Sequence, residues 1–438
     1  MKKIAFETLG CKLNFAETST IASKMEGYQR VDFKQPADVY VINTCAVTQN
    51  AERKLKEIIR QAKKRNPQAK IVTLGCLTQL DPHKVAQFPY VDLVLGMEEK
   101  YKLQEYLPGL LENRISGVHS CETNARETFY SAYSIGDRTR AFLKIQDGCD
   151  YPCTYCTIPL ARGKGRNPTV EQIVQNARKI ATSGIKEIVL TGVNIGTFID
   201  TSTGKKRTFF DLIQALDQVE GIERYRISSI EPNLLTDEII EYVLTKSPKF
   251  LPHFHIPLQS GSNEILGKMR RRYRRELYEQ KVQKIRSISS DASIGVDVIV
   301  GFPGETDELF EETYRFLKFL PVSYFHVFTY SERPNTLAAS MPGKVPGKVR
   351  AERSRKLREL SKRKELLFAE SQLGKTKSVL FERSRKNNMM TGWTENYLRV
   401  VHPYDESLVN QISEVKLLEN SPEGITVQIL STCLKSST

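Results

Sequence analysis

The sequence lacks the features that mark membrane-spanning and secreted proteins. No uninterrupted apolar run approaches the ~18 residues that a membrane-spanning helix needs. The first residues, MKKIAFETLG, place Glu7 where the apolar core of a signal peptide would have to continue. We therefore expect a cytoplasmic protein with no membrane partner. In that compartment, eight cysteines indicate metal or redox chemistry rather than disulfides.

Acidic residues are the minority among the charges. The chain has 51 Asp and Glu against 65 Lys and Arg, a net charge of +14. Between Lys344 and Glu365 there are ten basic and three acidic residues, and between Arg53 and Arg65 there are seven basic and one acidic. A solvated helix face explains either run alone. The two runs together with the net charge favour RNA as a polyanionic partner.

The most informative motif is Cys-x3-Cys-x2-Cys, formed by Cys149, Cys153 and Cys156 directly after the β-like run FLKIQD. Three thiolates at this spacing can ligate three irons of a cubane [4Fe–4S] cluster and leave the fourth iron open. A zinc knuckle and reduced core cysteines are the alternatives, although no fourth Cys or His lies nearby to complete a tetrahedron. With Tyr155 before the last cysteine, the motif resembles the radical S-adenosylmethionine (SAM) enzymes, in which the open iron binds SAM.

A second set of cysteines, Cys11, Cys45 and Cys76, is spread along the first part of the chain. Each ends a predicted strand: ETLGC, VINTC and VTLGC. The carboxyl ends of parallel strands meet at one edge of an open sheet, so we expect these thiols to converge. Buried cysteines near strand ends are often inert, but three at the same edge favour a second three-ligand cluster.

The pattern of β-like and helical runs predicts an α/β protein in three parts. Residues 1–113 alternate β-like and helical runs, which is typical of an open parallel α/β sheet. Residues 114–138 are polar and are interpreted as a linker. Residues 139–370 contain six β-like runs, which predict an incomplete (βα)6 TIM-type barrel followed by a basic helix. Residues 371–438 have short alternating segments, which predict a small antiparallel β-barrel.

Longer motifs resemble the methylthiotransferase family of radical SAM enzymes across nearly the whole chain. The pieces that carry the resemblance are LGCKLNFAET, NTCAVTQNAERKLKEIIR, TLGC and CDYPCTYCTIPLARGKGR. The tail is similar to the TRAM domain that ends these enzymes. The resemblance implies two [4Fe–4S] clusters and SAM as cofactors. By matching, Cys11, Cys45 and Cys76 would hold an auxiliary cluster, and Cys149, Cys153 and Cys156 the SAM cluster.

Within the family, GCKLN and NTCAVT resemble the enzymes that act on N6-threonylcarbamoyladenosine (t6A) at position 37 of tRNA, whereas those acting on isopentenyladenosine (i6A) typically have GCQMN. The resemblance implies addition of a methylthio group to C2 of t6A in the anticodon stem-loop. The C2–H bond is strong and unactivated, so a radical route is needed, and the cofactor supplies it. A one-electron reductant such as flavodoxin or ferredoxin, and a sulfur donor, would be further partners.

Polar and glycine residues at the ends of the predicted barrel strands are candidates for binding SAM. The carboxyl ends of such strands form the working face of a TIM-type barrel, and glycine allows close approach of the backbone. Each residue taken singly is also explained by ordinary loop chemistry. The candidates are Tyr155, Thr191, Gly192, Asn194, Ser229, Glu231, Gln259, Ser260, Ile299 and Gly301.

A third group combines cations, amides and aromatic rings that suit RNA phosphates and bases. Solvated helix faces, helix capping and core packing are the alternative interpretations. The candidates are Asn14, Asn43, Arg162, Arg166, Arg271, Arg272, Tyr273, Trp393 and Arg399. Neither Cys121 nor Cys433 is given a role.

Other functions remain open from the sequence. A methylthiotransferase acting on i6A or on a ribosomal protein would need the same two cysteine triads. A non-catalytic RNA-binding iron–sulfur protein would not need an open iron or SAM-binding strand ends, and a zinc-dependent RNA-binding module would hold no iron. Formation of 5′-deoxyadenosine on reduction separates the enzymes from these last two classes.

Overall fold

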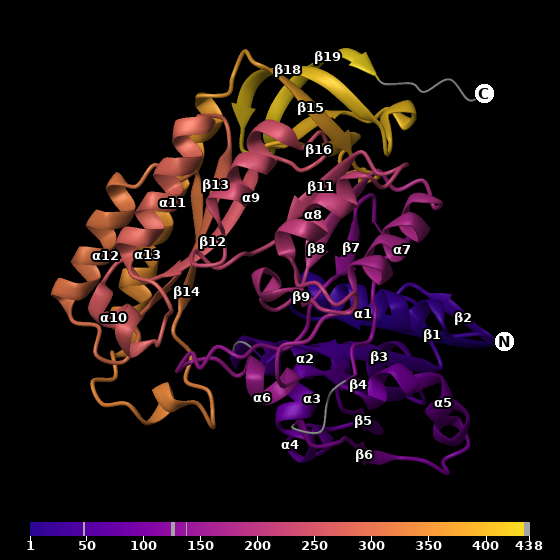
Figure 1. The fold of residues 1–438 in the computed structure, drawn as a ribbon. Helices are drawn as coiled ribbons and strands as arrows, with labels where there is room; N and C mark the ends of the chain where they lie inside the picture. The colour runs from indigo at the N-terminus through magenta and orange to yellow at the C-terminus, as the bar shows by residue number, and fades with distance from the viewer. Residues whose placement is uncertain (47–48, 124–127, 137, 433–438) are drawn as a thin grey trace.

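The computed structural model describes residues 1–46, 49–123, 128–136 and 138–432, which form three parts (Figure 1). A parallel sheet lies at one end, a half-barrel of parallel strands in the middle, and a small closed barrel at the other end. The predicted α/β fold class is thus confirmed. In the described part of the chain, no helix has both the length and the apolar character needed to cross a bilayer.

The N-terminal part is a six-stranded parallel sheet in the order β2-β1-β3-β4-β5-β6. Its strands are β1 (Lys2–Thr8), β2 (Tyr28–Val31), β3 (Val39–Thr44), β4 (Lys70–Gly75), β5 (Leu93–Leu95) and β6 (Gly117–His119). Its helices are α1 (Lys12–Ser23), α2 (Gln49–Arg65), α3 (Cys76–Leu80), α4 (Pro82–Ala86), the 3-10 helix η1 (Glu99–Lys102) and α5 (Leu103–Leu111). Strand β3 is buried along its whole length, as expected where helices cover both faces of a sheet.

The strand order reverses beside β1, because the chain first adds β2 on one side of β1 and then β3 on the other. In open parallel sheets such a switch point opens a crevice at the carboxyl ends of the strands, where ligands bind. Strands β2 and β6 are short edge strands with polar residues, so the sequence pattern did not reveal them. Since β6 pairs with β5, residues 117–119 belong to the sheet rather than to a linker over 114–138.

The central part confirms the predicted incomplete barrel. Its six strands are β7 (Ala141–Lys144), β8 (Glu187–Thr191), β11 (Arg224–Ile227), β12 (His253–Gln259), β13 (Ser293–Val300) and β14 (Tyr324–Thr329). They form two parallel three-stranded sheets, joined by parallel bridges between β11 and β12 at Tyr225–Phe250 and Ser229–His255. A short hairpin, β9 (Ile199–Asp200) and β10 (Arg207–Thr208), follows β8.

Amphipathic helices cover the outer face of this half-barrel. They are α7 (Val170–Ala181), α8 (Phe209–Asp217), α9 (Asp237–Glu241), α10 (Asn263–Lys268), α11 (Arg275–Ile288), α12 (Asp307–Phe319) and the basic α13 (Gly347–Glu370), whereas the short α6 (Ile158–Arg162) packs against α3 of the N-terminal part. Alternate strand residues such as Leu143 and Leu190 join the core beneath these helices. Because side chains alternate across a strand, Lys144 and Gln146 face the opposite, inner side.

The C-terminal part is a closed five-stranded barrel in the order β15-β16-β17-β19-β18. Its strands are β15 (Thr376–Phe381), β16 (Met389–Thr394), β17 (Arg399–Pro403), β18 (Ile412–Ser421) and β19 (Gly424–Thr432). All pairs are antiparallel except β17 with β19. Strand β16 was not predicted, because Gly392 interrupts its pattern; a Cβ there would lie 2.5 Å from Val379, so close packing requires glycine.

The small barrel docks on the amino ends of the half-barrel strands (Figure 1). Arg224, the first residue of β11, donates to the Trp393 carbonyl (3.3 Å), and Arg226 donates to the carbonyls of Thr394 and Glu395 (3.2 Å each). The cysteine motif follows the opposite, carboxyl end of β7. The C-terminal barrel therefore lies across the half-barrel from that motif.

Candidate active site with two cysteine centres

The loop after β7 presents Cys149, Cys153 and Cys156 as free thiols. Gly148 has a φ of +67°, and a Cβ there would collide with the Lys164 carbonyl, so the loop closes tightly against the segment that follows α6. On the other side, the Thr154 hydroxyl donates to the Lys268 carbonyl (3.0 Å). These contacts hold the three thiols on the carboxyl side of the half-barrel, as predicted.

Two side chains donate to thiols of this SAM triad. Arg271 donates to Cys153 Sγ at 3.2 Å and also pairs with Glu231, and Asn194 Nδ2 lies 3.9 Å from Cys149 Sγ. Burial raises the pKa of all three thiols, to about 12 for Cys156. Metal ligation needs thiolates, so iron binding has to displace these protons. The Arg271 guanidinium favours the thiolate at Cys153.

Two cavities meet at Cys156. One, of about 450 Å³, is lined by all three thiols of the SAM triad. The other, of about 230 Å³, is lined by Cys156, Asp297 and three of the residues predicted to bind SAM, namely Tyr155, Gln259 and Ile299. The second cavity thus opens directly beside the loop that carries the three thiols, where an organic ligand could reach an open iron of a cluster held there.

The remaining SAM candidates lie elsewhere on the strand ends. Asn194 and Glu231 belong to the cysteine surroundings just described, and Ser229 pairs with His255 at the junction of β11 and β12. Thr191 and Gly192 pack against the segment that follows β7, Ser260 is buried against Thr313, and Gly301 packs against Arg350. These last four do not line the 230 Å³ cavity, and their role in binding SAM stays a prediction.

The second triad assembles from three neighbouring strands. Cys11 precedes α1 at the end of β1, Cys45 follows β3, and Cys76 begins α3 after β4. Gly10 has a φ of +103°, and a Cβ there would lie 2.9 Å from Cys45 Sγ, so glycine is required for the first two thiols to come together. Cys11 is exposed, Cys45 half-buried and Cys76 buried. The three cysteines thus lie at the carboxyl ends of the adjacent strands β1, β3 and β4, as expected, and their role as cluster ligands stays a prediction.

Arg162 connects this auxiliary triad to the half-barrel. Its Nε donates to Cys76 Sγ (3.3 Å), while its terminal nitrogens bind both oxygens of Glu17 (3.0 and 2.9 Å) and Asp147 Oδ1 (2.9 Å). Glu17 lies on α1, Asp147 follows β7, and Arg162 ends α6. One guanidinium thus spans the N-terminal sheet, the SAM loop and an auxiliary thiol.

Two lysines complete this buried network. Lys100 and Lys144 donate to Glu17 at 2.6 and 3.0 Å, and all these side chains are almost fully buried. Burial would raise the pKa of Glu17, but Arg162, Lys100 and Lys144 hold it well below its usual value. Burial lowers the pKa of Lys100 to about 8 despite the opposing effect of Glu17. Sequence reasoning missed this network; its signal was a lysine inside the apolar run of β7.

Several predicted RNA contacts need correction because the side chains are buried. Asn14 donates to the carbonyls of Leu9 and Thr44, and Asn43 donates to the Asn14 carbonyl. The side chains in question are Asn14, Asn43, Arg162, Arg271 and Tyr273, with exposed fractions of at most 6%. They support the two cysteine centres or the strand ends and have no surface to offer RNA.

The other RNA candidates differ in their exposure. Trp393 is half-buried and stacks on Tyr397 at 4.6 Å between ring centroids, so its ring is not a free platform for a base. Arg166 is held by backbone carbonyls and Asp147. Arg272 and Arg399 are exposed, and their contact with RNA stays a prediction.

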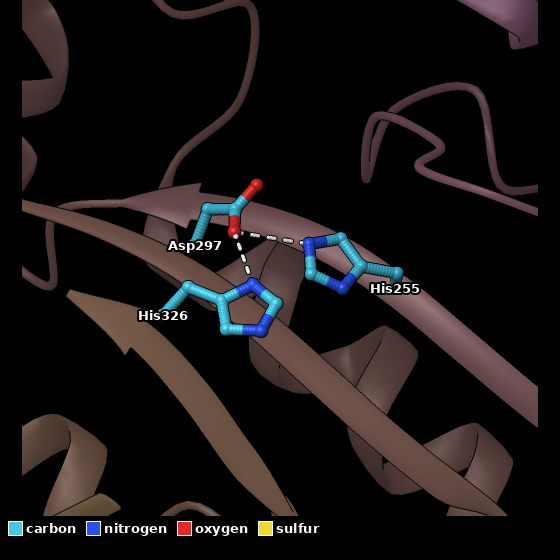
Figure 2. A group of neighbouring side chains, drawn as sticks. All are labelled: His255, Asp297 and His326. Carbon is cyan, nitrogen blue, oxygen red and sulfur yellow. Dashed lines mark hydrogen bonds and ion pairs between the residues drawn. The ribbon is translucent and has the colours of Figure 1, made fainter. Parts of the chain in front are cut away.

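A cluster that sequence reasoning did not anticipate lies on the inner face of the half-barrel. Figure 2 shows Asp297 of β13 between His255 of β12 and His326 of β14. One carboxylate oxygen lies 3.0 Å from His255 Nε2 and 3.3 Å from His326 Nδ1. Burial opposes ionisation, but the two imidazoles lower the pKa of Asp297. Because Asp297 also lines the cavity beside Cys156, the cluster makes one wall of that cavity polar.

Both triads suit a cluster held by three thiolates. Within the described residues, neither has a fourth thiol, because Cys121 donates instead to Glu98 (3.1 Å); Cys433 lies outside the described residues. Each triad has one arginine on a thiol, and these guanidiniums can offset the negative charge of a thiolate-bound cluster. The donor sets therefore fit two [4Fe–4S] clusters, each with one iron free for another ligand.

Comparisons with known proteins agree with this geometry. The model of the uncharacterized protein family UPF0004 matches residues 3–96, and that of the radical SAM superfamily matches residues 143–317. The threonylcarbamoyladenosine tRNA methylthiotransferase MtaB of Bacillus subtilis is 41% identical over 428 residues, covering 96% of this chain and 94% of its own. The chain belongs to the tRNA methylthiotransferase family. Its cofactors are accordingly SAM and two [4Fe–4S] clusters.

Two more distant matches are consistent with this family assignment. The tRNA-2-methylthio-N(6)-dimethylallyladenosine synthase of Clostridium botulinum is 32% identical and covers 95% of this chain and 93% of its own. The solved structure of the radical S-adenosylmethionine methyltransferase TsrM from Kitasatospora setae has a TM-score of 0.57 at 13% identity, covering 77% of this chain and 74% of its own. At that identity the likeness concerns the fold alone. Among tRNA methylthiotransferases, the higher identity favours the threonylcarbamoyladenosine group.

Proposed function

We propose that this protein adds a methylthio group to C2 of t6A at position 37 of tRNA. The observation that carries the proposal is the pair of three-thiol centres joined by Arg162, one beside an organic-ligand pocket and the other at a sheet switch point. One centre with SAM suits the activation of an inert C–H bond, and the other suits the delivery of sulfur. The name of the Bacillus relative supports t6A as the substrate.

The chain's own residues would then divide the work as follows. Cys149, Cys153 and Cys156 would hold the SAM cluster, and Cys11, Cys45 and Cys76 the auxiliary cluster. Bound at these positions, the clusters and SAM supply one-electron chemistry and sulfur, which no side chain offers. Tyr155, Gln259 and Ile299 would shape the pocket for SAM beside Cys156.

Positioning is the task of the buried charges. Arg271 would orient Cys153 and pair with Glu231, and Arg162 would fix the distance between the two centres. Because Arg162 and Glu17 are inaccessible to water, the junction they form is rigid and dry. Such preorganisation lets a reactive species meet its target base before it meets solvent.

The partners and the compartment follow from the same proposal. The substrate tRNA would bind through its anticodon stem-loop, with exposed basic residues along the surface contacting phosphates. A one-electron reductant such as flavodoxin or ferredoxin, and a sulfur donor, would complete the reaction. All of these partners belong to the cytoplasm, where we place the protein.

The direct test is mass spectrometry of nucleosides from bulk tRNA of cells with and without the gene. Loss of methylthio-t6A with accumulation of t6A on deletion would support both reaction and substrate. A shift of the i6A pair instead would keep the chemistry and reassign the substrate, in line with the name of the clostridial relative. No change in any methylthio nucleoside would refute a tRNA substrate and direct the search to a ribosomal protein.

A further inference from the structure

Lys12 is the first residue of α1 and directly follows the auxiliary ligand Cys11. Its side chain is half-buried, yet in the described ranges its ammonium has neither a hydrogen bond nor an ion pair. Lys100 and Lys144, the two other lysines in the interior near α1, both bind Glu17. A desolvated cation that lacks a partner is costly unless a ligand supplies one.

The charged groups around Lys12 increase its need for a negatively charged partner. The charged groups that act on its ammonium are Arg140, Arg226 and Glu187, and the phenol of Tyr397 also faces it. Glu187 is the carboxylate within this group, and it is already shared: Arg226 Nε lies 3.2 Å from it and Arg140 3.8 Å. Positive charge therefore exceeds negative charge among the groups that act on the Lys12 ammonium.

A further arginine also competes for Glu187. Arg224 lies 3.7 Å from the same Glu187, while Arg140 has a second acidic partner, Glu382, at 3.1 Å. Glu187 is thus shared by three arginines, Glu395 and Glu223 also act on Arg224, and no carboxylate of the described residues pairs with the Lys12 ammonium. Lys12 therefore lacks a negatively charged partner, and an anionic substrate group would supply one.

The location narrows the choice of anion. The carboxylate of SAM belongs at the open iron of the SAM triad, at the carboxyl ends of the strands. Arg140, Glu187 and Arg224 stand at the amino ends, about one strand length or ~15 Å away. A base presented to the auxiliary centre would instead bring its N6 substituent close to Lys12, since Lys12 is next to Cys11 in the chain.

We propose that Lys12 is a specificity-determining residue whose ammonium binds the carboxylate of the threonylcarbamoyl group of the substrate base. The inference rests on the proposed function, because t6A carries this carboxylate on N6 and i6A carries only an apolar group there. The excess positive charge of Arg140 and Arg226 adds to the attraction. A site built to pair a charged group discriminates strongly against analogues that lack it, because its own charge is then left unpaired.

The test measures binding of three anticodon stem-loop RNAs to cluster-loaded protein. The RNAs carry t6A, its neutral threonyl methyl ester, or unmodified adenosine at the same position. For the unaltered protein we expect t6A to bind about tenfold or more tightly than the ester, as a charge-assisted hydrogen bond implies. Lys12→Gln should remove this preference and leave ester binding unchanged, whereas Lys12→Arg should retain most of it.

A matched control is Lys24→Gln, which alters an exposed lysine at the other end of α1 and should bind all three RNAs as before. Iron content and thermal unfolding of each variant show whether it has folded. Equal weakening of all three RNAs by Lys12→Gln would mean a phosphate contact and overturn the inference, as would an unchanged preference for t6A. Failure of the unaltered protein to form methylthio-t6A on the first RNA would instead refute the proposed function.

Discussion

The two cysteine triads reach similar donor sets by opposite routes. Cys149, Cys153 and Cys156 lie within eight residues on one loop, which a single glycine turn closes. Cys11, Cys45 and Cys76 come from three strands, and their thiols meet only because the sheet is assembled with the order β1-β3-β4. The first centre is thus encoded by a short segment, whereas the second depends on the fold of a whole domain.

The difference extends to the charges beside each triad. Arg271 lies on the same domain as the SAM triad and pairs with a half-buried glutamate, Glu231. Arg162 serves the auxiliary triad from another domain, within a network that is almost fully buried. We infer that the SAM centre can be altered locally, whereas damage at the auxiliary centre spreads to the junction between domains.

The largest expected effects come from removing one ligand of each triad. Cys149→Ala should abolish both 5′-deoxyadenosine formation and the methylthio product, because an incomplete SAM cluster cannot cleave SAM. Cys45→Ala should lose the product but retain part of the SAM cleavage. Both readouts come from one reaction of reduced, reconstituted enzyme followed by mass spectrometry.

The control for this pair is Cys121→Ala, whose thiol contacts Glu98 and belongs to neither triad. It should keep both activities and the full iron content. Equal loss of the two activities in Cys45→Ala would argue against separate roles for the two centres.

The next largest effect is expected from Arg162, at the junction between the N-terminal sheet and the half-barrel. Arg162→Met removes a buried cation from Glu17 and Asp147, and should lower the free energy of unfolding by about 3 kcal/mol. It should also reduce the iron held by the auxiliary triad, because Cys76 loses its donor. Both effects are measured in protein that also carries Cys149→Ala. Chemical denaturation gives the free energy of unfolding, and iron analysis gives the iron held by the auxiliary triad.

Lys164→Met is the matched change, since Lys164 is exposed two residues further along the chain. It should leave both stability and auxiliary iron unaltered. If Arg162→Met behaved like Lys164→Met, the junction would not depend on this guanidinium.

This contrast also explains what the sequence could predict. The SAM triad was evident from spacing alone, and the auxiliary triad from three strand endings, because parallel strands align their carboxyl ends. The network of Glu17 and Arg162 was not evident. These residues lie 145 positions apart, and their pairing depends on how two domains dock.

Five of the predicted RNA contacts failed for a related reason, because their side chains are buried. Asn14 and Arg271 are polar residues in motifs, and polarity alone does not distinguish a surface contact from a buried support. Edge strands β2 and β6 were missed because short polar strands lack a clear alternation. Local pattern thus predicted elements and ligands, whereas long-range burial decided the roles of the surrounding charges.

Arg271 and Arg272 are neighbours in the chain, and changing each in turn tests which of them acts on the SAM centre. Arg271→Gln removes the donor to Cys153 and leaves Glu231 without its partner, so we expect at least about a tenfold slower formation of 5′-deoxyadenosine. Arg272→Gln should have little effect, because Arg272 is exposed and lies over the Tyr151 ring. Auxiliary iron should be normal in both variants. A similar loss in the two variants would mean that general positive charge, and not the contact with Cys153, matters.

The smallest expected effect concerns tRNA binding by the basic helices α2 and α13, which belong to different domains. On α2, which follows Cys45, the exposed side chains of Arg53, Lys54 and Arg60 have no hydrogen bond or ion pair among the described residues. On α13, Arg355 and Lys356 are exposed too, but each pairs with a glutamate one helical turn away. Side chains without an acidic partner are free to contact RNA phosphates, and each such contact releases counterions from the RNA. Helix α2 should therefore contribute more to tRNA affinity than α13.

The position of α2 also favours a role of this helix in binding tRNA. Glu52 in its first turn lies 3.6 Å from Arg333 of the half-barrel, so α2 borders the domain junction where the two centres meet. Changing Arg53, Lys54 and Arg60 together to glutamine should make the slope of log affinity against log salt shallower by about two, at roughly 0.7–0.9 per lost phosphate contact. Changing Arg355 and Lys356 should alter the slope by less than one. The reverse ranking would place the tRNA along the outer helix of the half-barrel and away from the auxiliary triad.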